Sequence, residues 1–198
     1  MDKTKKLYIY APDSEFLRPY IERELPDCEL VDTPDGADYT CAILSLDTPA
    51  PADCSMVLRC PYIVGTGMVG IPMVFARRIA RGTFCHIKGN ESRISLIHAV
   101  DVAVAVRLAL GQSGEYVITD GVSHTIHDFA EALAWRIDQK RIFTLKPVWA
   151  RWLIGRQMLQ FITSDHLADG SAFAERFNFQ PNNVCEYLRT HVYDDESL

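Results

Sequence analysis

Short apolar runs alternate with helical stretches along the first half of the chain, and this alternation constrains the fold more than any other feature. Three runs are dominated by apolar and β-branched residues, as the buried strands of a parallel sheet require; they cover 6–10, 28–31 and 37–46. Asp13 is placed to cap a helix between the first two runs. The pattern predicts strands connected by helices in one parallel sheet.

The alternation resumes after a proline-containing connector at 47–53, where the prolines break any helix. Residues 55–64 predict a further strand, followed by a glycine-rich turn and a helical stretch. Asp101 is placed to cap the next helix, and 115–119 predict one more strand.

The C-terminal third predicts mostly helices. Thr125 and Asp128 fit a capping box that opens one of them. We expect a single domain over 1–198, in which 1–120 form the sheet core and 121–198 form a small, mostly helical subdomain.

The composition excludes several classes of partner. The net charge is −6 and the pI is near 5.5, with acids and bases interspersed, so we expect neither nucleic acid nor an anionic membrane as a partner. No apolar run is long enough to span a membrane, and the N-terminal residues contain no signal-peptide core, so we expect a cytoplasmic protein. The six cysteines include no Cys-x-x-Cys pair and predict buried free thiols.

Six local patterns follow one another along the rest of the chain. They read VLRCPYIVGTGM, SRISLIHAVDVAVAVRLAL, GEYVITDG, HTIHDFAEALA, LKPVWARWLIG and DGSAFAERFNFQP. Their order resembles the second half of the extended short-chain dehydrogenase/reductases, the NAD-dependent epimerase/dehydratase family. The resemblance implies an α/β fold with a reduced Rossmann-like parallel sheet, helices on both faces and a small helix-rich C-terminal subdomain. It also implies NAD or NADP as the candidate cofactor.

The chain departs from this family at two places that carry its chemistry. Family members open with a glycine-rich turn through which the backbone approaches a pyrophosphate, whereas the turn at 11–17 has no glycine and contains Asp13 and Glu15. The connector at 47–53 stands where the family has a long segment with the catalytic Tyr-x-x-x-Lys. None of the eight tyrosines here is followed by lysine four residues later. We therefore predict no catalytic residue, because the usual acid/base group is missing.

Four residues are candidates for cofactor binding. Gly65, Gly67 and Gly70 form a Gly-x-Gly-x-x-Gly pattern between a strand and a helix, which is the context of a dinucleotide site. They also fit the turn after the sixth strand of the family, as a simple turn or a substrate-side loop. Asp32 ends the second predicted strand, where an acid can hold an adenosine ribose, although it also fits a polar strand terminus.

Two residues are candidates for substrate binding. Arg93 lies where some sugar-nucleotide relatives have a phosphate-binding arginine, and a solvated loop arginine is the alternative. His98 lies in the same matched segment, and the alternative is a satisfied polar group near the core.

Other chemistry-bearing residues favour structural roles. His124 and His127 could ligate a metal, but no third ligand is close in the sequence, so a role beside the helix cap is favoured and no metal is predicted. Trp135, Trp149 and Trp152 have helical spacing that suits core packing, or the lining of a ligand pocket.

These features favour a non-catalytic protein that keeps a pocket for a nucleotide or nucleotide sugar. Two alternatives stay open. The first is an oxidoreductase or epimerase with a relocated site at the 65–70 loop, and the second is a protein-interaction module that uses a sheet edge left open by the missing segment. The missing helices are those through which such relatives usually dimerise, so a homo-oligomer would need a different surface.

Overall fold

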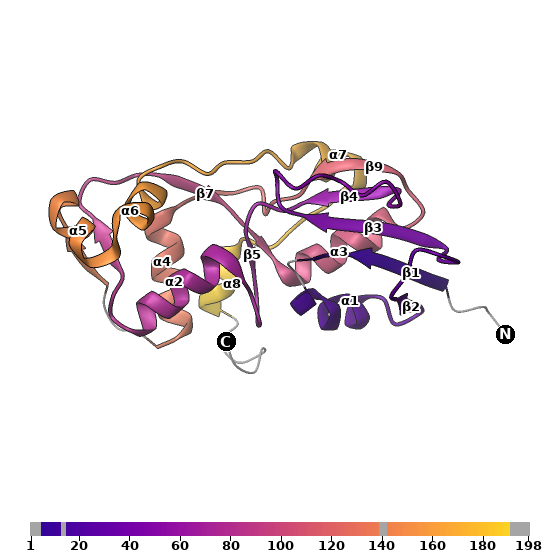
Figure 1. Ribbon diagram of the computed structural model, residues 1–198, viewed down its shortest axis with the longest axis horizontal. Helices are drawn as coiled ribbons and strands as arrows, with labels where there is room; N and C mark the ends of the chain where they lie inside the picture. The colour runs from indigo at the N-terminus through magenta and orange to yellow at the C-terminus, as the bar shows by residue number, and fades with distance from the viewer. Residues whose placement is uncertain (1–4, 13–14, 139–141, 191–198) are drawn as a thin grey trace.

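A five-stranded parallel sheet forms the centre of one half of the molecule (Figure 1). The computed structural model describes residues 5–12, 15–138 and 142–190, so the predicted helix cap Asp13 lies outside the described residues. The strand order is β2-β1-β3-β4-β9. The bounds are β1 Lys5–Tyr10, β2 Cys28–Val31, β3 Tyr39–Leu44, β4 Met56–Arg59 and β9 Gly114–Val117. The predicted Rossmann-like α/β fold class is confirmed.

Successive side chains along a strand of the sheet are buried in two different apolar clusters. The helices of this half are the 3-10 turn η1 (Glu15–Leu17), α1 (Arg18–Glu24), α3 (Ala99–Ala109) and α7 (Ser171–Phe177). Leu7, Ile43 and Leu58 are buried in the apolar cluster formed with α1 and α3, which lie together beside the sheet (Figure 1). Leu44 and Val57 belong to a separate small cluster, as the alternation of side chains along a strand requires.

The connector at 47–53 joins two strands that pair directly. In β3 and β4, Cys41 lies opposite Met56 and Ile43 lies opposite Leu58. The short connector therefore leaves no unpaired strand between β3 and β4, and the prediction of an open sheet edge there is wrong. The edge strands of the described sheet are β2 and β9.

Arg59 fastens the connector to the sheet. Its Nη1 donates hydrogen bonds to the carbonyl oxygens of Ser45, Leu46 and Thr48 at 3.1, 3.0 and 2.7 Å, and its Nε pairs with Glu115 on β9. Ser45 and Leu46 lead into the connector and Thr48 belongs to it, so these charge-assisted bonds fix the start of the connector at the end of β4.

The strand predicted over 55–64 is in fact two strands. β4 ends at Arg59, and β5 (Ile63–Val64) pairs with β8 (Ile97–His98) instead of continuing the sheet. Pro61 lies between them and has no N–H to donate to a strand ladder. The chain leaves the central sheet here and enters the second half of the molecule.

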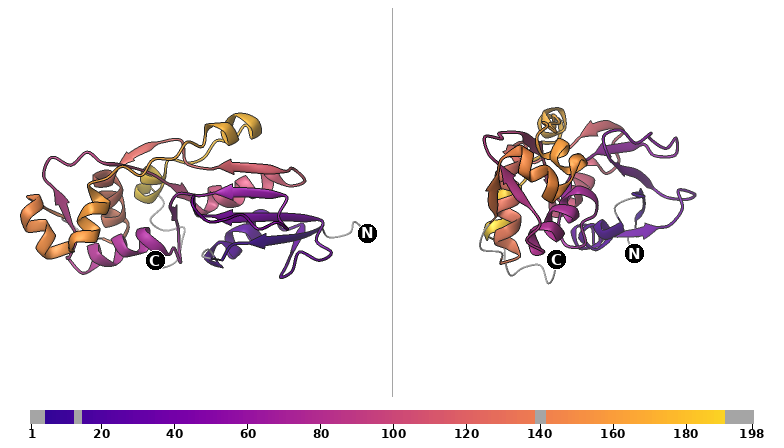
Figure 2. Two further views of the ribbon diagram at one scale, coloured as in Figure 1. Left: turned by 45° about the horizontal axis from the view of Figure 1, so that its top comes forward. Right: turned by 60° about the vertical axis from the view of Figure 1, so that its left-hand side comes forward.

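A second group of strands and helices lies at the end of the molecule away from the sheet (Figures 1 and 2), and its buried side chains form a second apolar cluster. Its strands are β6 (Cys85–Ile87), β7 (Arg93–Ser95), β10 (Ser123–Thr125) and β11 (Phe143–Leu145), and its helices are α2 (Gly70–Ala80), α4 (Ile126–Arg136), α5 (Pro147–Ile154), α6 (Arg156–Ile162) and α8 (Val184–Thr190). Phe75 and Phe129 are fully buried in it, with ring centroids 5.7 Å apart. Phe16 packs against both clusters and so joins the two halves.

The capping predictions had different outcomes. The Thr125 side chain accepts a hydrogen bond from the backbone N–H of Asp128 at 3.0 Å, which confirms the predicted cap of α4. The prediction for Asp101 is wrong, because His98 is the N-cap of α3: its Nδ1 accepts from the N–H of Val100 at 3.3 Å.

The three tryptophans do not pack in the core as predicted. Trp135, Trp149 and Trp152 are 64%, 65% and 86% exposed. Helical spacing identifies one face of a helix, but it does not show whether another element covers that face. In the described part of the chain, no helix has the length and apolar character needed to cross a bilayer.

Candidate functional site

A hollow of about 520 Å³ lies at the carboxyl ends of β1 and β2. β1 pairs with β2 on one side and with β3 on the other, so the direction of chain progression reverses beside it. Ligands of open parallel sheets bind at such a switch point, outside the carboxyl ends of the strands. The volume lies in the range of small-molecule sites.

Asp32 and Arg18 give this hollow its charge. The Asp32 side chain is 89% exposed, and its Oδ1 lies 3.4 Å from Nη1 of Arg18. Arg18 also donates from Nε to Glu22 at 2.9 Å, and its hydrogen bonds to Glu22 and Asp32 raise the pKa of the guanidinium. Glu15 adds a further acid to the lining. Because two carboxylates already match Arg18, the hollow suits hydroxyl groups and an apolar ring better than free phosphate.

A second hollow of about 260 Å³ continues toward α2, and Pro12 lines both. Phe16 and Tyr62 give it apolar walls, and the segment after β3 contributes Ser45 and Thr48, whose hydroxyls lie 2.6 Å apart. We call the two hollows together the groove. Its length follows the carboxyl edge of the sheet, where an extended ligand with two ends would lie.

The 65–70 loop packs on η1, α1 and α3. A Cβ atom at Gly65 would lie 2.8 Å from Cβ of Ala99, and one at Gly67 would lie 3.0 Å from Cβ of Phe16. The N–H of Thr66 donates to Tyr20 Oη at 2.8 Å. These close contacts account for Gly65 and Gly67 by packing alone.

Gly70 has a different environment. Its φ is +68°, it begins α2, and it lines the second hollow with no heavy atom within 4 Å of an added Cβ. Of the three glycines, Gly70 is therefore the one whose backbone faces the groove.

The two candidates for substrate binding lie elsewhere. Arg93 is exposed on β7, where its N–H donates to Asp165 at 2.8 Å and its Nη1 donates to the Ser123 carbonyl at 3.2 Å. His98 is buried, and its ring contacts Tyr20 and Tyr187 with centroid distances of 6.4 and 4.2 Å. Neither residue is among the described residues that line the groove.

Asp101 is a buried carboxyl group on α3. Its Oδ1 accepts from Asn182 Nδ2 at 2.8 Å, and its Oδ2 accepts from the Asn182 N–H at 3.2 Å. Burial raises the pKa of Asp101 to about 6, although the Asn182 hydrogen bonds act in the opposite direction. The carboxyl group joins α3 to the segment before α8, and it does not line the groove.

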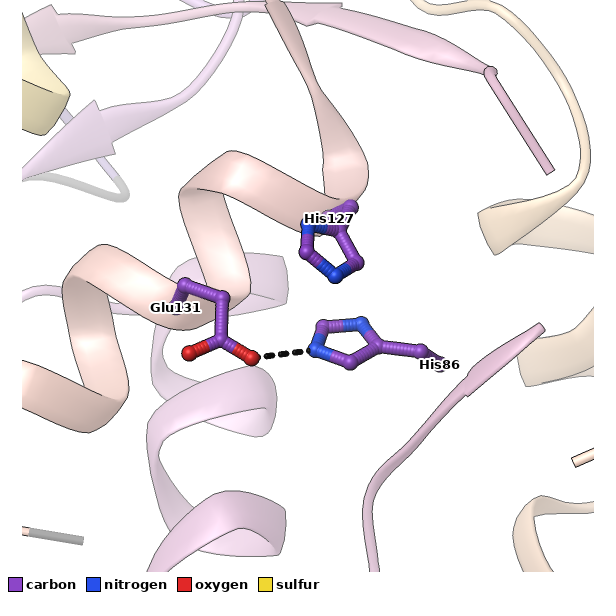
Figure 3. A group of neighbouring side chains, drawn as sticks. All are labelled: His86, His127 and Glu131. Atoms are coloured by element: carbon purple, nitrogen blue, oxygen red, sulfur yellow. Dashed lines mark hydrogen bonds and ion pairs between the residues drawn. The ribbon is translucent and has the colours of Figure 1, made fainter. Parts of the chain in front are cut away.

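His124 and His127, for which the sequence favours structural roles over metal binding, lie in different surroundings. His124 Nε2 lies 2.6 Å from Asp120, which also accepts from the N–H of Val184 at 3.0 Å. His127 instead lies beside His86 and Glu131, and their ligand atoms are all within 4.8 Å of one another (Figure 3).

The expectation that His127 has no further ligands nearby is therefore wrong. Glu131 follows it by one helical turn, a spacing that places both side chains on one face of α4. His86 comes from β6, and no sequence pattern connects it to α4.

Similar solved structures establish the fold class. Three of them are UDP-N-acetylglucosamine 4-epimerase from Bacillus cereus, the enzyme WbmF from Bordetella bronchiseptica in complex with NAD⁺ and UDP, and UDP-glucose 4-epimerase from Thermus thermophilus in complex with NAD. Their TM-scores are 0.62, 0.62 and 0.61 at 12%, 10% and 12% identity. The alignments cover 93%, 96% and 94% of this chain and 97%, 91% and 97% of those chains.

The chain therefore has an epimerase/dehydratase-like fold, as the six sequence patterns predict. No family model and no curated protein sequence matches it. The likeness concerns the fold, and any function must be argued from the residues of particular sites.

The groove fits the two parts of a dinucleotide unequally. The hollow beside Asp32 has the room and the hydrogen-bond acceptor that a nucleoside requires. The turn that leads from β1 to η1 has no glycine at which a pyrophosphate could approach the backbone closely, and Glu15 adds negative charge there. A pyrophosphate held in the usual way does not fit these residues.

Proposed function

We propose that this protein binds a nucleotide or nucleotide sugar in the groove and does not carry out the Tyr/Lys chemistry of the epimerases. The position of the groove carries this proposal, because it lies at the switch point of the sheet with Asp32 on its rim. Two of the similar structures hold NAD, and one also holds UDP, so NAD, NADP and UDP-sugars are the first ligands to test.

The contacts that we propose follow from the lining of the first hollow. The Asp32 carboxylate accepts hydrogen bonds from the two ribose hydroxyls, while Tyr10 and Leu30 give an apolar wall for the base. Gly70 and the start of α2 lie at the other end of the groove, where a polar or charged ligand group would meet free backbone N–H groups.

Turnover is not part of this proposal. None of the eight tyrosines has a lysine four residues later, so the proton transfer that the family performs with that pair has no agent at the usual spacing. All six cysteines are free thiols, which suits a reducing compartment, and we propose that the protein is cytoplasmic.

Isothermal titration of the protein with NAD, NADP, UDP and UDP-glucose tests this function. We expect at least one of them to bind, and Asp32→Ala to weaken that binding by roughly tenfold or more, because a hydrogen bond to a charged group contributes about 1.5–3 kcal/mol. Asp35→Ala is the matched control, since Asp35 is exposed nearby and does not line the groove. The proposal fails if none of the four binds, or if both variants bind equally well.

A second candidate function is protein binding through α5. Val148, Trp149 and Trp152 are all exposed on this short helix at the end of the molecule far from the sheet (Figure 1). Exposed apolar patches of this kind mark interaction surfaces, and large aromatic residues dominate the binding energy at such surfaces.

Light scattering on a size-exclusion column checks this candidate at increasing protein concentration. A mass above that of one chain that returns to 22.4 kDa in Trp152→Lys would support self-association through α5. A monomer at all concentrations would contradict self-association through this helix.

A further inference from the structure

His86, His127 and Glu131 come together outside the groove, in the half of the molecule away from the sheet (Figure 3). His86 is buried on β6, His127 is exposed near the start of α4, and Glu131 is partly exposed one turn later. The Nε2 atom of His86 lies 2.6 Å from Oε1 of Glu131, and the two imidazole rings lie 3.9 Å apart between centroids with a tilt of 34°.

Two rigid elements hold these side chains. On α4, His127 and Glu131 share one face because they are four residues apart, and Phe129 and Leu133 anchor the opposite side of the helix in the core. On β6, His86 is fixed by the pairing with β11, which places it opposite Thr144. The cluster is therefore positioned by the fold rather than by a loop.

We propose that His86, His127 and Glu131 bind one divalent transition-metal ion, with Zn²⁺ as the best match. Zinc takes imidazole nitrogen at about 2.0–2.1 Å and carboxylate oxygen at about 2.0–2.2 Å, usually with four ligands in a tetrahedron. The ligand atoms already lie within 4.8 Å of one another, so small side-chain rotations bring all three to one ion.

Metal binding replaces the contact between His86 and Glu131. When a neutral His86 donates from Nε2 to Glu131, its one N–H hydrogen lies on Nε2; when Nε2 binds the metal instead, that hydrogen lies on Nδ1, and the ring stays neutral. Because His127 is exposed, the fourth position opens to solvent and can take water or a small anion. Two histidines and one glutamate with an open position form a ligand set of the kind found in catalytic zinc sites.

The cysteines are the main competing ligands for zinc. Four of the six are buried, and burial raises the pKa of each of these thiols, which disfavours the thiolate that binds zinc. Cys28 and Cys54 are partly exposed, so the experiment must separate their binding from that of the histidines. Cobalt does this, because Co²⁺ bound to thiolate gives an intense near-ultraviolet charge-transfer band that nitrogen and oxygen ligands do not give.

The test is a Co²⁺ titration of the full chain without a polyhistidine tag, followed by displacement with Zn²⁺. We expect one Co²⁺ per chain, visible d–d absorption without the thiolate band, and loss of the visible signal when Zn²⁺ is added. His127→Ala and Glu131→Gln should each weaken binding by about tenfold or more. Glu175→Gln on α7 is the matched control and should bind as the unchanged protein does, because Glu175 is exposed and distant from the cluster.

Folding and ligand binding are separated by a second measurement. His127 is exposed and Glu131 is partly exposed, so thermal melts without metal should show that both variants fold. Zn²⁺ should then raise the melting temperature of the unchanged protein and of Glu175→Gln, but not that of His127→Ala or Glu131→Gln. A thiolate band, an absence of binding, or full affinity in His127→Ala and Glu131→Gln would overturn the proposal. No nucleotide is used, so the result is independent of the function proposed for the groove.

Discussion

The two halves of this molecule differ in which candidate sites they carry. The half that contains the sheet has an epimerase/dehydratase-like fold and carries the groove, while its sequence has no glycine in the turn after β1 and no Tyr-x-x-x-Lys pair. The other half holds a separate apolar cluster, a convergent His/His/Glu group and exposed tryptophans. Packing and chemistry are thus separable, and a fold does not show which half acts on a ligand.

The two halves also differ in the contacts that hold each of them together. On either side of the connector, β3 and β4 pair directly, and Arg59 binds the carbonyl groups of Ser45, Leu46 and Thr48, so a short connector is enough to join the two strands. In the other half, short paired strands and helices enclose Phe75 and Phe129. This leaves α4 free to present polar side chains on its outer face.

The largest effect that we expect comes from the core of the second half. Phe129→Ala should lower the free energy of unfolding by about 3–5 kcal/mol, because it leaves a cavity at a fully buried site. Urea unfolding followed by circular dichroism measures this change. Val148→Ala, at a side chain that is 70% exposed, should change it by less than about 0.5 kcal/mol. Similar losses in both variants would contradict the view that this half has its own closed core.

The next effect concerns Asp101, which ties α3 to the segment before α8. Its pKa of about 6 is above the usual 3.8, so the folded protein holds the proton more tightly than the unfolded chain. Stability should therefore fall by about 3 kcal/mol as pH rises from about 4 to about 6, with the full loss present above pH 6. Unfolding curves across this range should show the slope in the unchanged protein and a much smaller slope in Asp101→Asn. Equal slopes would show that Asp101 ionises normally.

A smaller effect tests how the connector is held. Arg59→Met should lower the free energy of unfolding by about 1.5–3 kcal/mol, because it removes hydrogen bonds from a charged group to three backbone carbonyls. Arg107→Met is the control: its ion pair with Glu24 at 2.6 Å is partly exposed and should contribute at most about 1 kcal/mol. If the Arg59 variant is as stable as the control, the connector does not depend on this residue.

The smallest effect is expected on α5. Trp152→Lys should change the free energy of unfolding by less than about 0.5 kcal/mol, because the indole is 86% exposed. Thermal and urea unfolding of the variant measure this. A loss above about 2 kcal/mol would show instead that the tryptophan packs against another part of the protein in solution.

Sequence reasoning recovers the sheet half well. Strands with side chains alternating between two apolar environments produce a strong local pattern, so β1, β2 and β3 are predicted close to their observed bounds. The break between β4 and β5 is missed because the apolar run continues through Cys60 and Pro61, although the proline signals it.

The second half is harder to predict because its features depend on contacts between distant segments. His86 and His127 are forty-one positions apart, and only the packing of β6 beside α4 brings them together. The four-residue spacing of His127 and Glu131 is visible in the sequence, but two ligands alone do not indicate a site. Likewise, the spacing of Trp149 and Trp152 identifies a helix face without showing that it is exposed.

The central claim is that the sheet half still binds a nucleotide ligand in the groove. The most direct measurement is a two-dimensional ¹H–¹⁵N NMR spectrum of the full chain during titration with NAD and then with UDP-glucose. We predict that the largest shifts fall on the amides of Tyr10, Ala11 and Asp32, which line the groove, while those of His127 and Glu131 stay unchanged. Shifts confined to the second half of the molecule, or none at saturating ligand, would contradict the claim.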